Sequence, residues 1–191
     1  MKTKYIITII SFVTSIAIYS QKNLAEVNKI NGVYIFTDSK PVEDYEVLGE
    51  IKADDSDKDI RISGAQYTSV RDNLINNSRL ANFSVEGLIL NLVNGGTDKA
   101  IMIKFKNKDR KNSIAKVEQY QGILIFTDCT PISDNNYIQT VNFYGSYGSG
   151  QYSNVRDILI KKAKRKYPDT EGIILKLVSG GKDLGDLVKF N

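Results

Sequence analysis

The sequence contains no histidine, and this absence excludes more chemistry than any other feature of its composition. Without histidine the chain cannot form a Ser-His-Asp triad, a Cys-His nucleophile pair or the usual histidine-bearing zinc sites. It also has no imidazole whose charge changes near neutral pH. Most familiar hydrolase mechanisms are therefore closed to it, and we favour a protein that is not an enzyme, with no cofactor and no metal site.

Cysteine is nearly absent as well. The single thiol, Cys129, cannot form a disulfide within the chain, so packing alone must hold the fold together. Hydrophobic residues make up 41% of the sequence and charged residues 25%, a balance well away from that of disordered chains. We therefore expect a packed core.

The N-terminus has the layout of a secretory signal peptide. A short basic start, Met1 to Lys4, precedes an apolar run from Tyr5 to Ile18, and a small residue, Ser20, follows. The apolar run is shorter than the roughly 20 residues that a membrane-spanning helix needs. We expect residues 1–20 to be a signal peptide that is cleaved near Ser20, which leaves a periplasmic or secreted protein without a membrane span.

The charge balance does not indicate a nucleic-acid partner. Loss of Lys2 and Lys4 with the leader would lower the formal net charge from +4 to +2, too small an excess for a nucleic-acid-binding surface. The basic run at 161–166 has no interleaved aromatic residues and fits the solvated face of a helix. We expect the partner to be a protein or another component of the cell envelope.

The remaining chain contains an internal repeat. Residues 32–41 match residues 122–131 at an offset of 90, and from residues 67–75 and 152–160 onward the match continues at an offset of 85. Two long copies indicate a duplication of a small domain, since solenoids stack many shorter repeats.

The boundary between the copies falls in a charged, polar stretch that suits a solvated linker. The expected domains are a first repeat at 21–105, a linker at 106–116 and a second repeat at 117–191.

Both copies show the same pattern of secondary structure. Runs rich in β-branched and aromatic residues predict strands, and apolar residues at three-and-four spacing predict helices that begin near Tyr67 and Tyr152. The predicted strands cover residues 32–37, 45–53, 86–93 and 99–105 in the first copy and 122–127, 137–143, 171–178 and 184–190 in the second. We therefore predict an α+β fold of two tandem ββαββ modules, each a small, mostly antiparallel sheet with one helix packed on it.

Charged residues at matching positions of the two copies are the candidate ligand-binding residues: Asp38, Arg71 and Glu86 in the first, and Asp128, Arg156 and Glu171 in the second. Each aspartate follows the first strand, where it could act as a ligand or an acid/base group, or cap its own turn through an Asx hydrogen bond. Each arginine precedes an aspartate in the first part of a helix, which suits an anion site or a structural ion pair. Each glutamate starts the third strand, and with the aspartate it could form a paired-acid site.

Three further features have simpler interpretations. Residues 55–59 begin like a calcium loop, but Ile60 and Gln66 stand where the glycine and the closing glutamate of an EF-hand belong. The loop at 144–150 carries tyrosines that could bind a sugar or a partner, or simply close the connection. Cys129 is the counterpart of Ser39 and reads as a small filler.

The order of a strand, a Thr-Asp turn, a tyrosine-containing strand ending in Gly49, and a helix with an arginine near its start resembles the YbjQ-like family of small heavy-metal-binding α/β domains. The resemblance covers residues 30–105 and 120–190, in a tandem exported form similar to proteins of Gram-negative bacteria. The Gly-Ala-Asp-Ala stretch of that family is replaced here at residues 84–87, and a cysteine or histidine cluster is missing. The resemblance implies a small α/β fold and a metal or small-ligand site.

Three functional hypotheses follow. The leading one is an exported, non-enzymatic binding or interaction module. The second is a metal- or small-ligand-binding domain of YbjQ-like type that uses hard oxygen ligands from the candidate carboxylates. The third is a hydrolase with a carboxylate pair, which requires aspartate and glutamate side chains to converge in one cleft.

Overall fold

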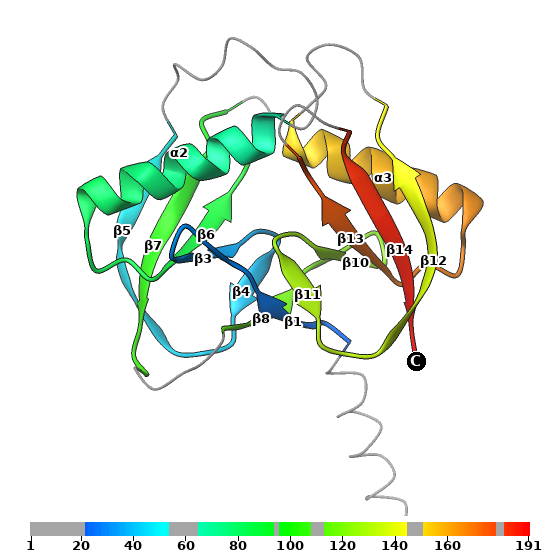
Figure 1. The fold of residues 1–191 in the computed structure, drawn as a ribbon, viewed down its shortest axis with the longest axis horizontal. Helices are drawn as coiled ribbons and strands as arrows, with labels where there is room; N and C mark the ends of the chain where they lie inside the picture. Colours follow the sequence, from blue (N-terminus) through cyan, green and yellow to red (C-terminus); the bar gives the residue numbers. More distant parts are fainter. Residues whose placement is uncertain (1–21, 54–64, 94–95, 108–112, 145–150, 179–181) are drawn as a thin grey trace, which may run out of the picture.

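The computed structural model describes residues 22–53, 65–93, 96–107, 113–144, 151–178 and 182–191. The expected signal peptide at 1–20 and the acidic loop at 55–59 lie outside these residues. The described part contains two helices and three mostly antiparallel sheets, which confirms the predicted α+β class (Figure 1). Neither of these helices has the length and apolar character needed to cross a membrane.

The elements follow the same order in the two halves of the chain. The first half contains β1 (Leu24–Val27), β2 (Lys29–Ile30), β3 (Val33–Phe36), β4 (Ser39–Pro41), β5 (Tyr45–Lys52), α2 (Ala65–Ala81), β6 (Gly87–Asn91) and β7 (Lys99–Phe105). The second half contains β8 (Ile114–Val117), β9 (Gln119–Tyr120), β10 (Ile123–Phe126), β11 (Cys129–Pro131), β12 (Asn135–Asn142), α3 (Tyr152–Lys166), β13 (Gly172–Lys176) and β14 (Leu184–Phe190).

The predicted strands and helices are present, but the described order of each half is longer than ββαββ. Three short strands in each half, β1, β2 and β4 and their counterparts β8, β9 and β11, were not predicted. Ile114 to Lys116, which the sequence assigns to the linker 106–116, are the first residues of β8. Ala115 in this strand is fully buried, so a solvated linker does not describe this part of the chain.

Each half builds a five-stranded sheet with one helix on it. The strand order is β2-β3-β6-β7-β5 in the first half and β9-β10-β13-β14-β12 in the second. Within each sheet only the pairs β3–β6 and β10–β13 are parallel. The chain between the two strands of each parallel pair includes the helix, and such a crossover connection is what allows two neighbouring strands to run in the same direction.

A four-stranded sheet joins the two halves, and its strand order is β11-β1-β8-β4. The first half supplies β1 and β4, and the second half supplies β8 and β11. Each of the three antiparallel pairings therefore connects one half to the other. At its centre Ala25 pairs with Ala115, and both side chains are fully buried.

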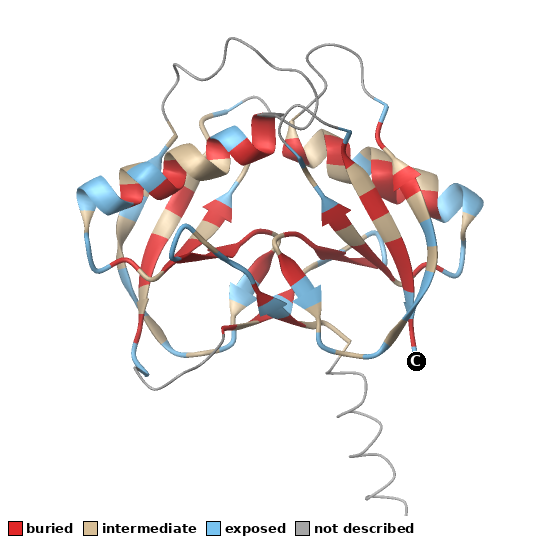
Figure 2. Ribbon diagram, viewed as in Figure 1, coloured by how far each residue is buried: buried red, intermediate tan, exposed pale blue. Residues whose placement is uncertain are grey.

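The strands β3 and β10 are buried on both faces because a different layer covers each face. Along β3, Val33 and Ile35 point into the core beneath the helices. The alternate residues Tyr34 and Phe36 point into a second core against the four-stranded sheet. This alternation follows from the two-residue period of a strand, and Figure 2 shows the buried layer crossing the centre of the molecule.

The hydrophobic core beneath the helices is continuous between the halves. Leu74 from α2 and Leu159 from α3 belong to one cluster of buried side chains, together with Ile35 and Ile125 from the two sheets. The tyrosines at the helix starts, Tyr67 and Tyr152, belong to the same cluster. Both hydrophobic cores thus contain residues from the two halves, and the four-stranded sheet contains strands from both.

Candidate functional site

Asp38 and Asp128 lie where the chain passes from a five-stranded sheet into the shared four-stranded sheet. Each follows a threonine at the end of a central strand, and Thr37 and Thr127 form an antiparallel bridge between the halves. Both aspartates have positive φ, 49° and 54°. This left-handed conformation is one that aspartate tolerates better than most residues, and it turns the chain into the shared sheet.

The carboxylate of Asp128 accepts hydrogen bonds from the first half. The hydroxyl of Tyr67 donates to Oδ2 over 2.6 Å, and Nη1 of Arg71 lies 3.3 Å from both carboxylate oxygens. Thr37 bonds to the Tyr67 hydroxyl at 2.9 Å. Because the carboxylate only accepts, the tyrosine proton points to Asp128 and the threonine must donate to the tyrosine oxygen.

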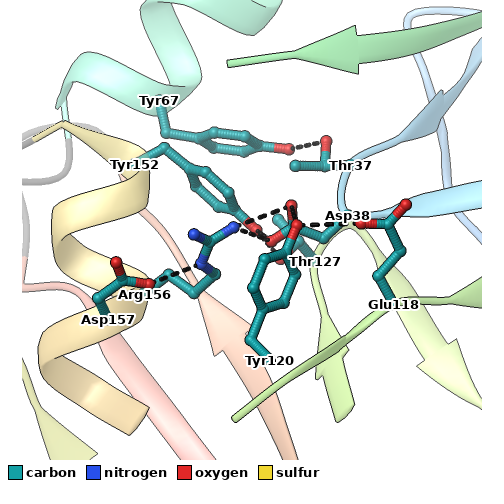
Figure 3. A network of polar contacts seen from close by, with 9 residues as sticks. All are labelled: Thr37, Asp38, Tyr67, Glu118, Tyr120, Thr127, Tyr152, Arg156 and Asp157. Carbon is teal, nitrogen blue, oxygen red and sulfur yellow. Dashed lines mark hydrogen bonds and ion pairs between the residues drawn. The ribbon is translucent and has the colours of Figure 1, made fainter. Parts of the chain in front are cut away.

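The carboxylate of Asp38 makes the mirrored set of contacts with the second half (Figure 3). The hydroxyl of Tyr152 donates to Oδ2 over 2.6 Å, and Nη1 of Arg156 lies 3.1 and 3.0 Å from the two oxygens. Thr127 bonds to the Tyr152 hydroxyl at 2.8 Å. Each half therefore supplies the aspartate that accepts hydrogen bonds from the tyrosine and the arginine in the helix of the other half.

The two tyrosines lie side by side where the two helices begin. Their ring centroids are 5.1 Å apart with an angle of 34° between the rings. Burial, followed by the neighbouring carboxylate charge, raises the pKa of Tyr67 and of Tyr152 well above the usual value. Both hydroxyls are therefore protonated at neutral pH, so they act as hydrogen-bond donors and not as bases.

The arginines are held in the charged state. Burial, the largest single effect, lowers the pKa of Arg71 and Arg156. The charges of Asp128 and Asp38, together with the hydrogen bonds and charges of the neighbouring Asp72 and Asp157, outweigh it and raise both pKa values. The arginine side chains are only 13% exposed, and those of Asp38 and Asp128 are 11% and 17% exposed. Largely desolvated pairs with two bonds per guanidinium are strong and geometrically specific.

The expected ion pairs between neighbouring residues in the helices are also present. Nε of Arg71 donates to Asp72, and Nε of Arg156 donates to Asp157, in both cases over 3.0 Å. Each arginine thus joins two carboxylates, one from its own helix and one from the other half. The structural interpretation of the Arg-Asp sequence is confirmed.

The two networks differ at Tyr120 and at Glu118, whose counterpart in the first half is Asn28. The hydroxyl of Tyr120 lies 2.9 Å from Oδ1 of Asp38 and 3.0 Å from Oε2 of Glu118, and the Arg156 guanidinium lies 3.7 Å above the Tyr120 ring. The counterpart of Tyr120 in the first half is Ile30, at the same offset of 90. Asp38 therefore has one more neutral donor than Asp128.

The space beside the networks is too small for a ligand. A cavity of about 10 Å³ lies between the helix starts, lined in part by Tyr67, Tyr152 and Gln66. Pockets that hold small molecules typically measure about 300–1,000 Å³. The polar groups of the networks face one another across the two halves.

The candidate glutamates lie in a different place. Glu86 accepts the backbone N–H of Phe105 over 2.8 Å, and Glu171 accepts that of Phe190 over 2.7 Å. Glu171 also pairs with Lys22 at 3.2 Å. Of the six candidate residues, the structure therefore brings together Asp38 with Arg156 and Asp128 with Arg71, and it uses Glu86 and Glu171 to fix strand ends.

Cys129, the basic run at 161–166 and Tyr144 lie outside the two networks. Cys129 is buried in β11, and burial raises the pKa of its thiol to about 12, so it is unreactive at neutral pH. The basic run forms the end of α3, which stops before Tyr167 and Pro168 as predicted. Tyr144 is 68% exposed, and residues 145–150 lie outside the described residues.

Sequence reasoning missed the tyrosines and threonines of the networks. Tyr67 and Tyr152 were assigned only to the buried stripe of each helix, and Thr37 and Thr127 only to strands. The signal was a second match between the copies, because a tyrosine stands four residues before each arginine and a threonine directly before each aspartate. Residues four apart share one face of a helix, so tyrosine and arginine can reach the same carboxylate.

No family model, curated protein or solved structure matches the chain. Among the described residues, no group of three or more cysteine, aspartate or glutamate side chains is placed to hold a metal ion.

Asp183 is a buried carboxylate that the networks do not include. It is 1% exposed, and neither carboxylate oxygen has a hydrogen bond of normal geometry within the described chain. In the first half the equivalent Asp98 accepts the N–H of Val93 over 2.9 Å. Burial raises the pKa of Asp183 to about 6, and the nearby N–H of Val178 offsets this only in part.

We predict that Asp38→Asn lowers the free energy of unfolding by about 3 kcal/mol, because it leaves Arg156 largely buried without its partner from the other half. Asp128→Asn should cost less, since Asp128 lacks the bond from a tyrosine equivalent to Tyr120. Tyr120→Ile, which copies the first half, should cost less than about 2 kcal/mol. Urea unfolding measures all three. A change below 0.5 kcal/mol for both aspartate variants, within the range of ordinary surface substitutions, would show that the networks do not hold the halves together.

We also predict a pH dependence that Asp183→Asn removes. The folded-state pKa of about 6 lies above the reference value of 3.8, so the folded state binds the proton more tightly than the unfolded state. The stabilisation from the protonated side chain is therefore complete below pH 3.8 and is lost as the pH rises through about 6. The difference in unfolding free energy between the variant and the original protein should grow in the variant's favour over this range. A constant difference from pH 4.5 to 7.5, an interval that spans the raised pKa, contradicts the assignment.

Proposed function

We propose that the protein is an exported, non-enzymatic binding module whose ligand contacts lie on its outer surface. The observation that carries this proposal is the crossed arrangement of Asp38 and Asp128. These aspartates and the arginines Arg71 and Arg156 are charged groups that the two halves have in common, and each pair contacts the opposite half. Because these residues join the two halves, their presence in both copies does not require that they bind a ligand.

The chemistry of the networks supports a binding role over a catalytic one. The tyrosines Tyr67 and Tyr152 stay protonated, the arginines stay charged, and the aspartates accept several donors at once. A general base has to reach its substrate and has to titrate near the working pH. The tyrosines and arginines of the networks do not titrate near neutral pH, and the cavity between the helix starts measures about 10 Å³.

The outer surface offers strands and side chains for a partner. β5 and β12 are the outer edge strands of the two five-stranded sheets, so one side of each has backbone groups without a neighbouring strand. Apolar side chains are exposed at equivalent positions, Val47 and Tyr137 on these strands, at 63% and 60%. Val42 and Ile132 are likewise exposed at 57% and 50%.

The arrangement also supports a duplicated architecture. We propose that each half is a ββαββ module that has added short strands and exchanges them with its neighbour. The equal strand order of the two five-stranded sheets and the equivalent pairing partners of β1 and β8 support this view. The exchange explains why two small modules without disulfides share one core.

Export is part of the proposal, on the strength of the leader in the sequence. The protein recovered from its own host should have an intact mass that lacks residues 1–20, with cleavage near Ser20. A mass that retains this segment would remove the periplasmic or secreted location from the proposal, whereas binding by the folded part would not depend on it.

The absence of turnover tests the non-enzymatic role. The protein, incubated with chromogenic glycosides, phosphate esters and carboxylate esters, should release no product above the blank. Turnover that Asp38→Asn abolishes, at a temperature where circular dichroism shows the variant to be folded, would overturn the proposal and favour a carboxylate mechanism. Heat on titration with calcium, zinc or copper would instead favour the metal-binding alternative. The protein concentration must be high enough to detect weak sites with dissociation constants of about 10⁻⁴ M.

A further inference from the structure

A basic groove lies in the described part of the second half of the chain. The groove lies between the end of β12 and α3, and its volume is about 290 Å³. Its lining residues are Asn142, Tyr144, Ile158, Lys161, Lys162 and Arg165. Three of these are cations and none is a carboxylate. We call it the β12–α3 groove.

One of the cations is fixed by the fold, and the other two are available. Nζ of Lys162 donates to the backbone oxygen of Asn142 over 2.8 Å and lies 4.9 Å from the centre of the Tyr144 ring. Lys161 and Arg165 are exposed and form no ion pair with another residue in the part of the chain that the structure describes. Among the described residues, the positive charges of Lys161 and Arg165 therefore have no neutralising partner.

The first half shows that the fold does not require this charge. At the offset of 85, the counterparts of Lys161 and Arg165 are Asn76 and Leu80. Asn77, the counterpart of Lys162, donates to the backbone oxygen of Lys52 over 3.1 Å, so it keeps the same strand contact without the charge. The fold therefore uses one hydrogen bond to the strand at this position, but it does not require the positive charges of Lys161, Lys162 and Arg165.

The rim of the groove is aromatic and polar. The ring of Tyr144 is 68% exposed, and its hydroxyl accepts a hydrogen bond from the Asn142 amide over 3.1 Å. That bond lowers the pKa of the Tyr144 hydroxyl, and the charges of Lys182 and Lys162 add a smaller effect in the same direction. An exposed aromatic face beside cations suits a ligand that has both an apolar face and a negative charge.

We propose that the β12–α3 groove binds a carboxylate-bearing sugar residue of an acidic polysaccharide. The sugar carboxylate pairs with Lys161 and Arg165, and the C–H face of the ring packs on Tyr144 by dispersion. The groove is short and close to the lower limit of ligand pockets, so it fits one ring of a chain better than an extended acidic peptide. This inference rests on the proposed binding function and names its ligand class.

The test is a titration of the whole isotope-labelled chain with trigalacturonate, followed by NMR of the backbone amides and of the sugar. Amides of Tyr144, Ile158 and Lys161 should shift, while those of Asn76 and Leu80 should not. The dissociation constant is expected at about 1 mM, and it should rise with salt because the contacts are exposed ion pairs. Neutral galactotriose should bind at least tenfold more weakly, which corresponds to about 1.4 kcal/mol.

A double variant that copies the first half at both positions should fold normally. Lys161→Asn combined with Arg165→Leu should weaken trigalacturonate binding about tenfold, a loss in line with two exposed ion pairs. Lys166→Asn, which removes an exposed charge from the same helix outside the groove, is the matched control for Lys161→Asn. It should change the affinity less than twofold.

Several results would overturn the inference. These are no amide shifts up to about 10 mM trigalacturonate, equal affinity for galactotriose, equal affinity for a tri-aspartate peptide, or no effect of the double variant. A tight tri-aspartate complex would identify the groove as a site for an acidic protein segment. Shifts confined to other surfaces would leave the binding module standing without this groove. New reducing-end signals from cleaved sugar would instead overturn the non-enzymatic function itself.

Discussion

The pairing of β1 with β8 is the interaction on which the rest of the structure depends. These two short strands belong to different halves, and their pairing places β4 and β11 on the outside of the shared sheet. For the chain to reach that sheet it must turn after Thr37 and Thr127, and the turn brings Asp38 and Asp128 against the opposite helices. The crossed carboxylates, the paired tyrosines and the continuous core all follow from this one exchange of strands.

The exchange also explains how a chain without disulfides can use two such small halves. A single half of this size buries little apolar surface, and its central strand would expose one face to water. The exchange covers Phe36 and Phe126 with strands from both halves. The charged networks add orientation, because a buried aspartate with an arginine and a tyrosine as donors tolerates little displacement.

Much of the fold could be predicted from sequence, because its longer elements carry their own periodic patterns. The strand at 32–37, the helix from Tyr67 and their counterparts have apolar residues at spacings that one structure satisfies. β1, β2 and β4 have four, two and three residues, too few for a period to show, and their partners lie far away along the chain. The Asn31-Gly32 turn before β3, in which both residues have positive φ, was the local sign of one missed hairpin.

The candidate site could be predicted only in part. The repeat identified Asp38, Arg71, Asp128 and Arg156, but it did not specify how they pair, and the structure pairs them between copies. No local pattern specifies such a crossing, because it depends on which half β4 and β11 join. Glu86 and Glu171 occupy matching positions of the two copies because each has the same structural role. Each accepts the backbone N–H of the phenylalanine that ends the neighbouring strand. The sequence showed the run of lysines, but only the structure shows that they line a groove with Tyr144 at its rim.

Native-state hydrogen exchange on Leu74→Ala tests the central claim, that the two halves form one cooperative unit, most directly. Leu74 is fully buried in the first half, and its truncation should cost about 2–5 kcal/mol. The account predicts that the amide of Leu159, in the helix of the second half, loses the same free energy of opening as amides in the first half. Unchanged protection at Leu159 would show that the halves open independently and would contradict the account.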